Sequence, residues 1–374
     1  MSPDPVADES AGSASASGES PASGPRRRRV ASSTLKRASA LGSGRPATIY
    51  DVARAAGVSH QTVTRYLNGF EGIRPETRAR VKDALRALDY RPNLNARSLN
   101  SGRSRRIGAL IQEIDQYGPS KVLQGATAAA REAGYVLDVV AQDVSRRTSI
   151  MAALDLLSEH DLAGILALSS TDEMTRAFES SRFGVPVVIC TEPDDVTSGH
   201  PSELTTRGFP GLVRHLADLG HRRFLHIAGP TAWSSARNRA RAYEAAVARH
   251  GLRSVATLPG DWTARSGFDA VMGVPGELGA TAVVAANDQM ALGAMLALTR
   301  RGLSVPGDVS VTGVDDIPDA AFFSPPLTTL RADFAAQGRA AVAALLAQID
   351  GGESEVDRTW HSELVVREST GEAP

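Results

Sequence analysis

From Ile107 onward the sequence alternates short apolar runs with longer polar or small-residue stretches, and this alternation restricts the fold more than any other feature. Seven of the runs have the length of a strand: RRIGALI, YVLDVV, GILALS, VPVVIC, RRFLHIAG, TAVVAAND and VSVTGVDD. A buried strand followed by a helix is the repeating unit of a parallel, doubly wound sheet. The strands fall into two comparable sets, 107 to roughly 203 and roughly 204 to 325. We therefore predict an α/β domain over residues 107–374, with two lobes and a cleft between them.

The composition excludes membrane-spanning and disulfide-bonded classes of protein. The longest apolar runs, such as Thr281 to Ala286, have the length of strands, far short of the roughly 20 residues that a helix needs to cross a bilayer. The N-terminus shows no signal-peptide pattern, so we expect a cytoplasmic protein with no membrane partner. Because Cys190 is the only cysteine, an intramolecular disulfide and a multi-cysteine metal site are excluded. We expect neither a metal nor a cofactor.

The net charge of −1 conceals an uneven distribution of charge along the chain. Residues 26–106 carry 19 Lys and Arg against 5 Asp and Glu, whereas residues 107–374 carry 22 against 33. A basic segment attached to an acidic body is typical of nucleic-acid binding, because cations gathered on one face displace the counterions of phosphates. Residues 1–45 form a tail of low complexity that we expect to be disordered, and its arginines Arg26 to Arg29 either contact nucleic acid or merely solvate the chain.

Residues 46–92 carry the signals of three short helices. Thr48 is a typical N-cap, and Gly57 ends the helix that begins there. Ser59 caps a second helix of about two turns, and a third helix begins at Pro75. Two short helices joined by a tight glycine turn form a helix-turn-helix unit. The segment is therefore predicted to be a small, all-helical DNA-binding domain.

The second of these helices presents an unusually polar surface. With Val63 and Leu67 turned toward the core, its outward side chains are short or fork-shaped donors, and residues 59–69 contain neither Lys nor Glu, which a merely solvated helix face favours. Such side chains reach base edges in the major groove, while hydroxyls and helix N-termini hold phosphates. We therefore predict DNA contacts from Thr48, Ser59, His60, Gln61, Thr64, Arg65 and Asn68.

Seven longer stretches follow one another between residues 48 and 367: TIYDVARAAGVSHQTVTRYLNG, YRPNLNARSLNSGRSRRIG, RHLADLGHRRFLHIAGP, SARNRARAY, GDWTARSGFDAV, ANDQMALGAM and PPLTTLRADFAAQG. Together they resemble the successive signatures of the lactose and galactose repressor family of bacterial transcription regulators. The resemblance implies an N-terminal all-α helix-turn-helix DNA-binding domain joined to a two-lobed α/β domain like the periplasmic binding proteins, with two doubly wound parallel sheets. It also implies a sequence-specific repressor of carbohydrate-utilisation genes.

Residues 93–106 have two interpretations. Taken alone, NLNARSLN is a linker, because it is short and lacks a continuous apolar face. The resemblance implies instead a hinge helix that folds on operator DNA and pairs with its dimer mate in the minor groove. Leu99 matches the family's leucine wedge, which unstacks a base step at a cost of a few kcal/mol, although without the resemblance it would be assigned a structural role. In this interpretation the DNA contacts of the segment are Asn93, Ala96 and Leu99.

Polar side chains follow several predicted strands, at the edge where doubly wound sheets bind their ligands. A carboxylate accepts hydrogen bonds from two adjacent hydroxyls, an arginine fork donates to two ring oxygens, and an indole covers the apolar face of a sugar. These residue types suit a saccharide. By resemblance, the contacts with a small sugar-like effector fall on Gln112, Arg239, Trp262, Asn287 and Asp315.

Some of these residues also have plainer interpretations. An aspartate at the end of a strand is often a helix N-cap. This is the role that we favour for Asp288 and Asp316, and it is an open alternative for Asp315. For Trp262 the open alternative is a position in the hydrophobic core. Two departures from the family leave the identity of the effector open. Thr191 stands where many members have an aspartate, and the usual Asp-Asn pair before the lobe crossover is replaced within SELTTRG.

Two classes of function fit these features. The first is a ligand-controlled DNA-binding regulator, homodimeric because one helix-turn-helix reads only half of a palindromic operator. The second is a sugar-binding protein or an enzyme on the same α/β body without gene regulation. The basic head and the lack of a signal peptide argue against transport, and the lack of G-x-G-x-x-G, G-x-S-x-G, H-E-x-x-H and P-loop patterns argues against an enzyme.

The resemblance also predicts how the lobes are connected and used. The chain should cross between them three times, so that Asp333 to about His361 return to the first lobe. An effector bound between the lobes should change their relative angle and thereby move the hinge segments. The tail ESTGEAP contains no leucine heptad, which predicts dimers rather than tetramers.

Overall fold

The structure is a computed structural model, and it describes residues 46–90, 104–141, 147–168, 171–190, 192–199, 201–354, 356 and 361–374. The chain divides into two compact units, Met1–Pro92 and Asn93–Pro374. The predicted tail, 1–45, lies outside the described residues, as does the part of the predicted hinge from 93 to 103.

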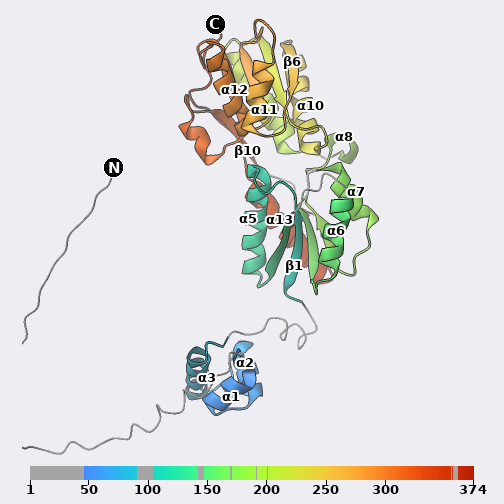
Figure 1. The fold of residues 1–374 in the computed structure, drawn as a ribbon, viewed down its shortest axis with the longest axis vertical. Coiled ribbons are helices and arrows are strands. Elements are labelled where there is room, and N and C mark those ends of the chain that lie inside the picture. Colours follow the sequence, from blue (N-terminus) through green and yellow to red (C-terminus); the bar gives the residue numbers. More distant parts are fainter. Residues whose placement is uncertain are drawn as a thin grey trace, which may run out of the picture. The chain divides into compact units, whose positions relative to one another are not determined.

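The first unit is the predicted bundle of three helices: α1 (Ile49–Ala56), α2 (His60–Leu67) and α3 (Pro75–Ala87) (Figure 1). Thr48 caps α1 in a reciprocal capping box, and Gly57, in the left-handed region at φ 63°, ends the helix by donating its backbone N–H to the carbonyls of Ala53 and Arg54. Ser59 caps α2 by accepting a hydrogen bond from the backbone N–H of Thr62 at 3.2 Å. The buried core of the bundle consists of Val52, Ala53, Ala56, Val63, Val81 and Ala84.

The first lobe of the second unit is built on a four-stranded parallel sheet in the order β2-β1-β3-β4. Alternate residues of β1 face opposite sides, as the pleat of a strand requires. Ile107, Ala109 and Ile111 pack against α5 and α13, whereas Leu110 packs against α6 and α7. The strands are β1 (Arg106–Ile111), β2 (Val136–Ala141), β3 (Gly164–Leu168) and β4 (Val187–Ile189), and the helices are α5 (Tyr117–Glu132), α6 (Arg147–Ser158), α7 (Asp172–Ser180) and α13 (Phe334–Ile349).

The second lobe is built on a six-stranded sheet in the order β10-β9-β8-β7-β5-β6. Helices again cover both faces: Leu225 and Ile227 of β5 share a core with α11 and α12, and Phe224 shares one with α9 and α10. The strands are β5 (Arg223–Ala228), β6 (Arg253–Pro259), β7 (Ala282–Ala285), β8 (Ser310–Asp315), β9 (Thr328–Ala332) and β10 (Ser362–Val365). The helices are η1 (Leu204–Gly208), α9 (Phe209–Asp218), α10 (Ser234–Arg249), α11 (Ala264–Met272), α12 (Asp288–Arg300) and η2 (Pro318–Phe322).

The chain passes between the lobes as the resemblance predicted. It leaves β4 of the first lobe through the short helix α8 (Asp195–Ser198) and enters the second lobe at η1. After β9 it returns as α13, which packs along α5 in the first lobe (Figure 1), and it ends as β10 in the second sheet.

Two details differ from the predicted pair of parallel sheets. β10 runs antiparallel to β9 at the edge of the second sheet, whereas all the other strand pairs of that sheet are parallel. In addition, β6, β9 and β10 were not among the seven strands predicted from apolar runs. In the ranges that the structure describes, no helix is both long and apolar enough to cross a membrane.

Candidate functional site

The outward side of α2 carries most of the predicted DNA contacts. Ser59, His60, Gln61, Arg65 and Asn68 are exposed. The buried face of the helix is anchored by Val63, which is fully buried in the three-helix core. The helix therefore presents a polar surface on a rigid support, which is the arrangement that direct reading of base edges requires.

Two of the predicted DNA contacts already have partners within the bundle. The Thr48 hydroxyl lies 2.6 Å from Asp51 Oδ2 in the capping box, and the Thr64 hydroxyl donates to the backbone carbonyl of His60 at 3.0 Å. Both side chains are partly buried. A phosphate could still approach these hydroxyls, but each one also stabilises a helix, so its replacement would affect folding as well as binding.

Two exposed aromatic residues beside this surface were not predicted. Tyr50 of α1 is 62% exposed, and its ring centre lies 5.2 Å from that of His60. Phe70, just after α2, is 52% exposed, and the guanidinium of Arg65 lies 5.6 Å from its ring centre. Neither aromatic belongs to the helix that the sequence singled out, so only the packing of neighbouring segments reveals them. The predicted hinge contacts Asn93, Ala96 and Leu99 lie outside the described residues.

A pocket opens between the two lobes at the carboxyl ends of their strands. Its empty space, including the open solvent at its mouth, is about 720 Å³. Four of the five predicted effector contacts line it, namely Arg239, Trp262, Asn287 and Asp315. The remaining lining residues are Gln116, Tyr117, Gly118, Pro119, Val122, Leu168, Cys190, Glu192, Trp233, Ser235, Phe334 and Gln337.

Arg239 and Asp315 form the polar centre of the pocket. Both side chains are buried, and Arg239 Nη1 lies 3.7 Å from Asp315 Oδ1. Arg239 Nη1 also donates to the backbone carbonyl of Ala286 at 2.5 Å, and the guanidinium lies 5.4 Å from the ring centre of Trp262. Its orientation is thus fixed by a carbonyl and an indole, while its contact with the carboxylate is too long for a hydrogen bond.

The pocket contains more buried acid than base. Burial raises the pKa of Asp315 to about 7; Arg239 opposes the shift and Glu192 adds to it. Burial likewise raises the pKa of Glu192, again against the attraction of Arg239. Two carboxyl groups therefore share one guanidinium, and hydrogen-bond donors brought by a ligand would favour their ionised form.

Trp262 and Asn287 are positioned by each other. The Asn287 side chain donates to the backbone carbonyl of Trp262 at 2.8 Å and accepts from the backbone N–H of Met290 at 2.9 Å, so it also caps α12. Trp262 is held at φ 71° and Asp315 at φ 117°, conformations that L-residues rarely adopt. Backbone strain of this kind is found preferentially at functional sites.

Comparison with known proteins identifies both units. Residues 48–93 match the family model of bacterial regulatory proteins, lacI family, and residues 213–370 match that of a periplasmic binding protein-like domain. The lactose operon repressor of Escherichia coli K12 is 33% identical over 328 residues, which cover 87% of this chain and 91% of the repressor. The chain belongs to the lacI family. The ribose operon repressor of the same organism is 33% identical over 308 residues, covering 81% and 93% of the two chains.

A solved structure of a lacI-family member has the same architecture. The Lac repressor dimer bound to operator and the anti-inducer ONPF superposes with a TM-score of 0.75 at 32% identity, covering 87% of this chain and all of that one. As a lacI-family protein, the chain is a DNA-binding transcription regulator with an effector-binding body, not an enzyme. The predicted alternative of an enzyme or a sugar-binding protein without gene regulation is therefore set aside.

Gln112 does not line the pocket of this lacI-family chain. It follows β1, is buried, and its side-chain N–H lies 3.4 Å from Glu113 Oε1. In its place the first lobe contributes Gln116 and Tyr117, which come from the next turn of the same segment. The number of residues between the first strand and the pocket could not be predicted from the sequence.

Three other lining residues were missed for identifiable reasons. Trp233 follows β5 and its loop, where the rule that ligands bind beyond strand ends would have placed it. Glu192 comes one residue after Thr191, so the pocket does receive a carboxylate from the end of this segment although the expected position holds threonine. Phe334 comes from α13 and reaches the pocket only because the chain returns to the first lobe.

Asp288 and Asp316 have structural roles, but the prediction that they are helix N-caps is wrong, because Asn287 caps α12 and η2 has no side-chain cap hydrogen bond. Asp288 is fully buried at the start of α12, where it accepts from the backbone N–H of Ile317 at 2.8 Å and from the Thr329 hydroxyl at 2.5 Å. Asp316 accepts from Arg331 at 2.8 Å and from Arg367 at 2.5 Å. Both acids tie neighbouring segments of the second lobe together.

Proposed function

We propose that this chain is a homodimeric regulator of carbohydrate-utilisation genes, acting mainly as a repressor, whose affinity for a palindromic operator is controlled by a small saccharide bound between its lobes. The outward residues of α2 read the operator, and residues 93–106 act as the hinge that transmits the position of the lobes. The effector contacts are Arg239, Trp262, Asn287 and Asp315, which all line the pocket, whereas Gln112 does not. Such a protein works in the cytoplasm, where its operator is.

The observation that carries the proposal is a set of buried polar atoms without a hydrogen-bond partner, on residues that line the pocket. Arg239 Nε, Trp262 Nε1 and Asp315 Oδ1 are buried, and none has a hydrogen bond within the described residues. A buried donor or acceptor left unpaired is costly, so its partner is normally a ligand or an ordered water. Two donors and one carboxylate oxygen beside an indole match the ring oxygen, hydroxyls and apolar face of a sugar.

An exposed apolar face on the second lobe supports the dimer. Leu292 and Leu296 lie four residues apart on α12, on one side of the helix, and are 40% and 51% exposed. Met272 at the end of the neighbouring helix α11 is also exposed. A face of this kind on a protein that reads two half-sites suits a symmetric contact with a second copy.

The effector site is tested by a thermal-shift screen of mono- and disaccharides, including lactose, ribose and cellobiose, on the wild-type protein and on Asp315→Ala. A saccharide that binds only the folded state raises the unfolding temperature with concentration. We expect at least one sugar to do so in the wild type and none in Asp315→Ala. The exposed acid Glu244 of α10 provides the control variant Glu244→Ala, which should keep the wild-type response.

Operator binding separates loss of the site from loss of the fold. Asp315→Ala should still shift operator DNA in a gel, but its affinity should no longer change when the sugar is added. If Asp315→Ala responded to the sugar as the wild type does, the assigned site would be wrong.

A further inference from the structure

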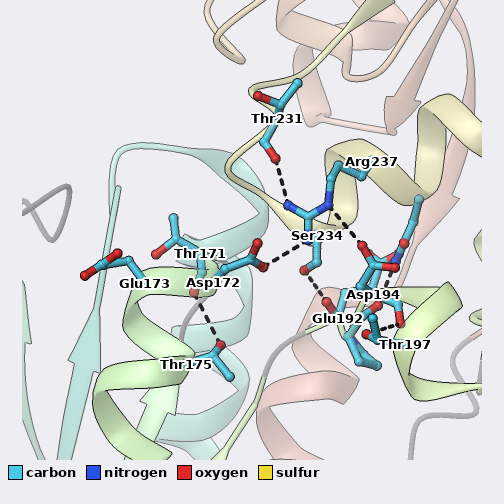
Figure 2. Close-up of polar contacts among 12 residues, drawn as sticks. Thr171, Asp172, Glu173, Thr175, Glu192, Asp194, Thr197, Thr231, Ser234 and Arg237 are labelled. Atoms are coloured by element: carbon cyan, nitrogen blue, oxygen red, sulfur yellow. Dashed lines mark hydrogen bonds and ion pairs between the residues drawn. The ribbon is translucent and has the colours of Figure 1, made fainter.

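The two lobes touch directly at one edge of the pocket, where α7 of the first lobe meets α10 of the second. Asp172 is the first residue of α7 and Arg237 lies in the first turn of α10. Arg237 Nη2 donates to Asp172 Oδ1 at 2.9 Å, as Figure 2 shows. This ion pair links helices that belong to different lobes and lie 65 positions apart in the sequence.

The guanidinium of Arg237 is held by three segments at once. Besides Asp172, it donates through Nε to Asp194 Oδ2 at 3.0 Å and through Nη1 to the backbone carbonyl of Thr231 at 2.7 Å. Asp194 belongs to the crossover between the lobes and also accepts from Arg241 at 2.8 Å. Burial opposes the ionisation of Asp194, but the hydrogen bonds from the two arginines outweigh it and lower its pKa. Asp194 and Thr231 therefore hold the guanidinium of Arg237 in the orientation in which it binds Asp172 of the first lobe.

Backbone contacts beside the ion pair reach the walls of the pocket. Thr171 forms an antiparallel bridge with Trp233, and Asp172 N donates to the carbonyl of Ala232 at 3.4 Å. The Ser234 hydroxyl donates to the carbonyl of Glu192. Because Trp233 and Glu192 both line the pocket, the lobe contact and the shape of the binding site depend on the same short segments.

The strength of this contact suits a reversible closure. The Asp172 side chain is 48% exposed and that of Arg237 is 25% exposed, so water screens the pair and competes for both groups. A partly exposed ion pair contributes little to global stability. It can nevertheless shift a balance between two lobe positions that differ little in free energy.

We propose that Arg237 is a positioning residue, which latches onto Asp172 to hold the lobes closed over the pocket when no effector is bound. When the lobes open, this ion pair and the Thr171–Trp233 bridge break. The contact between Arg237 and Asp194 is kept, because it joins the second lobe to the crossover segment and not to α7. The inference uses the proposed effector site only to explain why closure matters, and it can be tested without any effector.

The test measures the distance between the lobes in the full-length protein. Because the single native cysteine, Cys190, is buried, Glu179→Cys on α7 and Ala245→Cys on α10, both at exposed positions, accept nitroxide labels selectively. Double electron–electron resonance, on labelled chain diluted with unlabelled chain, then reports distances within one protomer. We expect Asp172→Asn to raise the ratio of open to closed lobes about two- to five-fold, as the loss of a partly exposed ion pair predicts.

Three further variants separate a latch from a general loss of structure. Asp172→Glu should restore the closed distance, and Asp172→Arg should open the lobes more than Asp172→Asn because it repels Arg237. Glu173→Gln removes the neighbouring acid from the same helix terminus and should leave the distance unchanged. All four should unfold at nearly the wild-type temperature. If Asp172→Asn and Asp172→Arg gave the wild-type distance distribution, the latch would be disproved, whatever the effector screen shows.

Discussion

Asp315 combines a strained backbone, deep burial and incomplete pairing at the end of β8. Its pKa is raised to about 7, first by burial and further by Glu192, in spite of Arg239. An unfolded chain releases this proton near pH 4. Between about pH 4 and pH 7 the folded state therefore binds a proton that the unfolded state lacks, and its stability falls as the pH rises through that window.

This linkage predicts how Asp315→Asn changes the pH dependence of stability. In urea unfolding of the ligand-free protein between about pH 5 and pH 7.5, the variant should lose less stability with rising pH than the wild type, because the amide does not ionise. The control is Asp308→Asn: hydrogen bonds from Ser304 lower the pKa of Asp308, so its contribution changes only below this range. Equal slopes for Asp315→Asn and the wild type would show that Asp315 ionises normally.

Gln61 tests the reading of bases by α2. Its exposed amide can form two hydrogen bonds with an adenine edge. Gln61→Ala should weaken binding by about 1–3 kcal/mol on the preferred operator and relax the preference at one position in each half-site. Fluorescence anisotropy with single-base operator variants measures both effects. Uniform weakening across all the variants would instead indicate a phosphate contact.

At the scale of elements, α5 and α13 lie so close together that only glycine fits between them. A Cβ at Gly338 would lie 1.9 Å from the carbonyl oxygen of Val122, and one at Gly125 would lie 2.0 Å from that of Ala335. Both clashes involve backbone atoms, which cannot move aside without separating the helices. The chain returns from the second lobe as α13, and this close approach to α5 holds α13 against the sheet of the first lobe.

Gly338→Ala should therefore destabilise the first lobe by about 1–3 kcal/mol, although alanine favours helix more than glycine does. Gly211→Ala in α9 is the matched control, since no atom lies within 4 Å of the added Cβ, and it should be neutral or stabilising by about 0.5–1 kcal/mol. Chemical denaturation of both variants makes the comparison. A Gly338→Ala protein as stable as Gly211→Ala would contradict the packing.

The elements that could be predicted are those that bury continuous apolar runs. β3 and β7 are buried along their whole length, and both appeared as such runs in the sequence. β6 and β10 lie at the two edges of the second sheet and contain no fully buried residue, so their sequences RSVATLP and SELV carry no apolar signal. The helix caps Thr48 and Ser59 were predicted because capping is local chemistry that three or four residues determine.

The site as a whole could be predicted only in part, because it is assembled from segments of both lobes. Arg239, Asn287 and Asp315 lie at or after the carboxyl ends of strands of one sheet. The rule that ligands bind at these strand ends, together with the resemblance, was enough to predict them. Tyr117 and Phe334 face the pocket from α5 and α13, whose relation depends on the third passage of the chain between lobes and on glycine contacts distant in sequence. No local sequence pattern predicts that α5 and α13 pack against each other.

The proposed dimer makes a prediction for the whole molecule. Leu296→Asp places a charge on the exposed apolar face of α12 and should shift the protein toward monomers in sedimentation equilibrium, with weaker operator binding as a consequence. Val196→Asp, at a position 71% exposed on α8, is the matched control and should remain dimeric. A dimeric Leu296→Asp protein would place the interface elsewhere.

The most direct test of the whole account is selection of binding sites from random duplex DNA by the purified full-length protein, followed by titration of the selected site with each sugar that stabilises the protein. We expect a palindromic consensus of two half-sites and a change in affinity when the sugar is added. Enrichment of no sequence over random DNA, with the sugars present and with them absent, would contradict the assignment of α2 as a reader of bases.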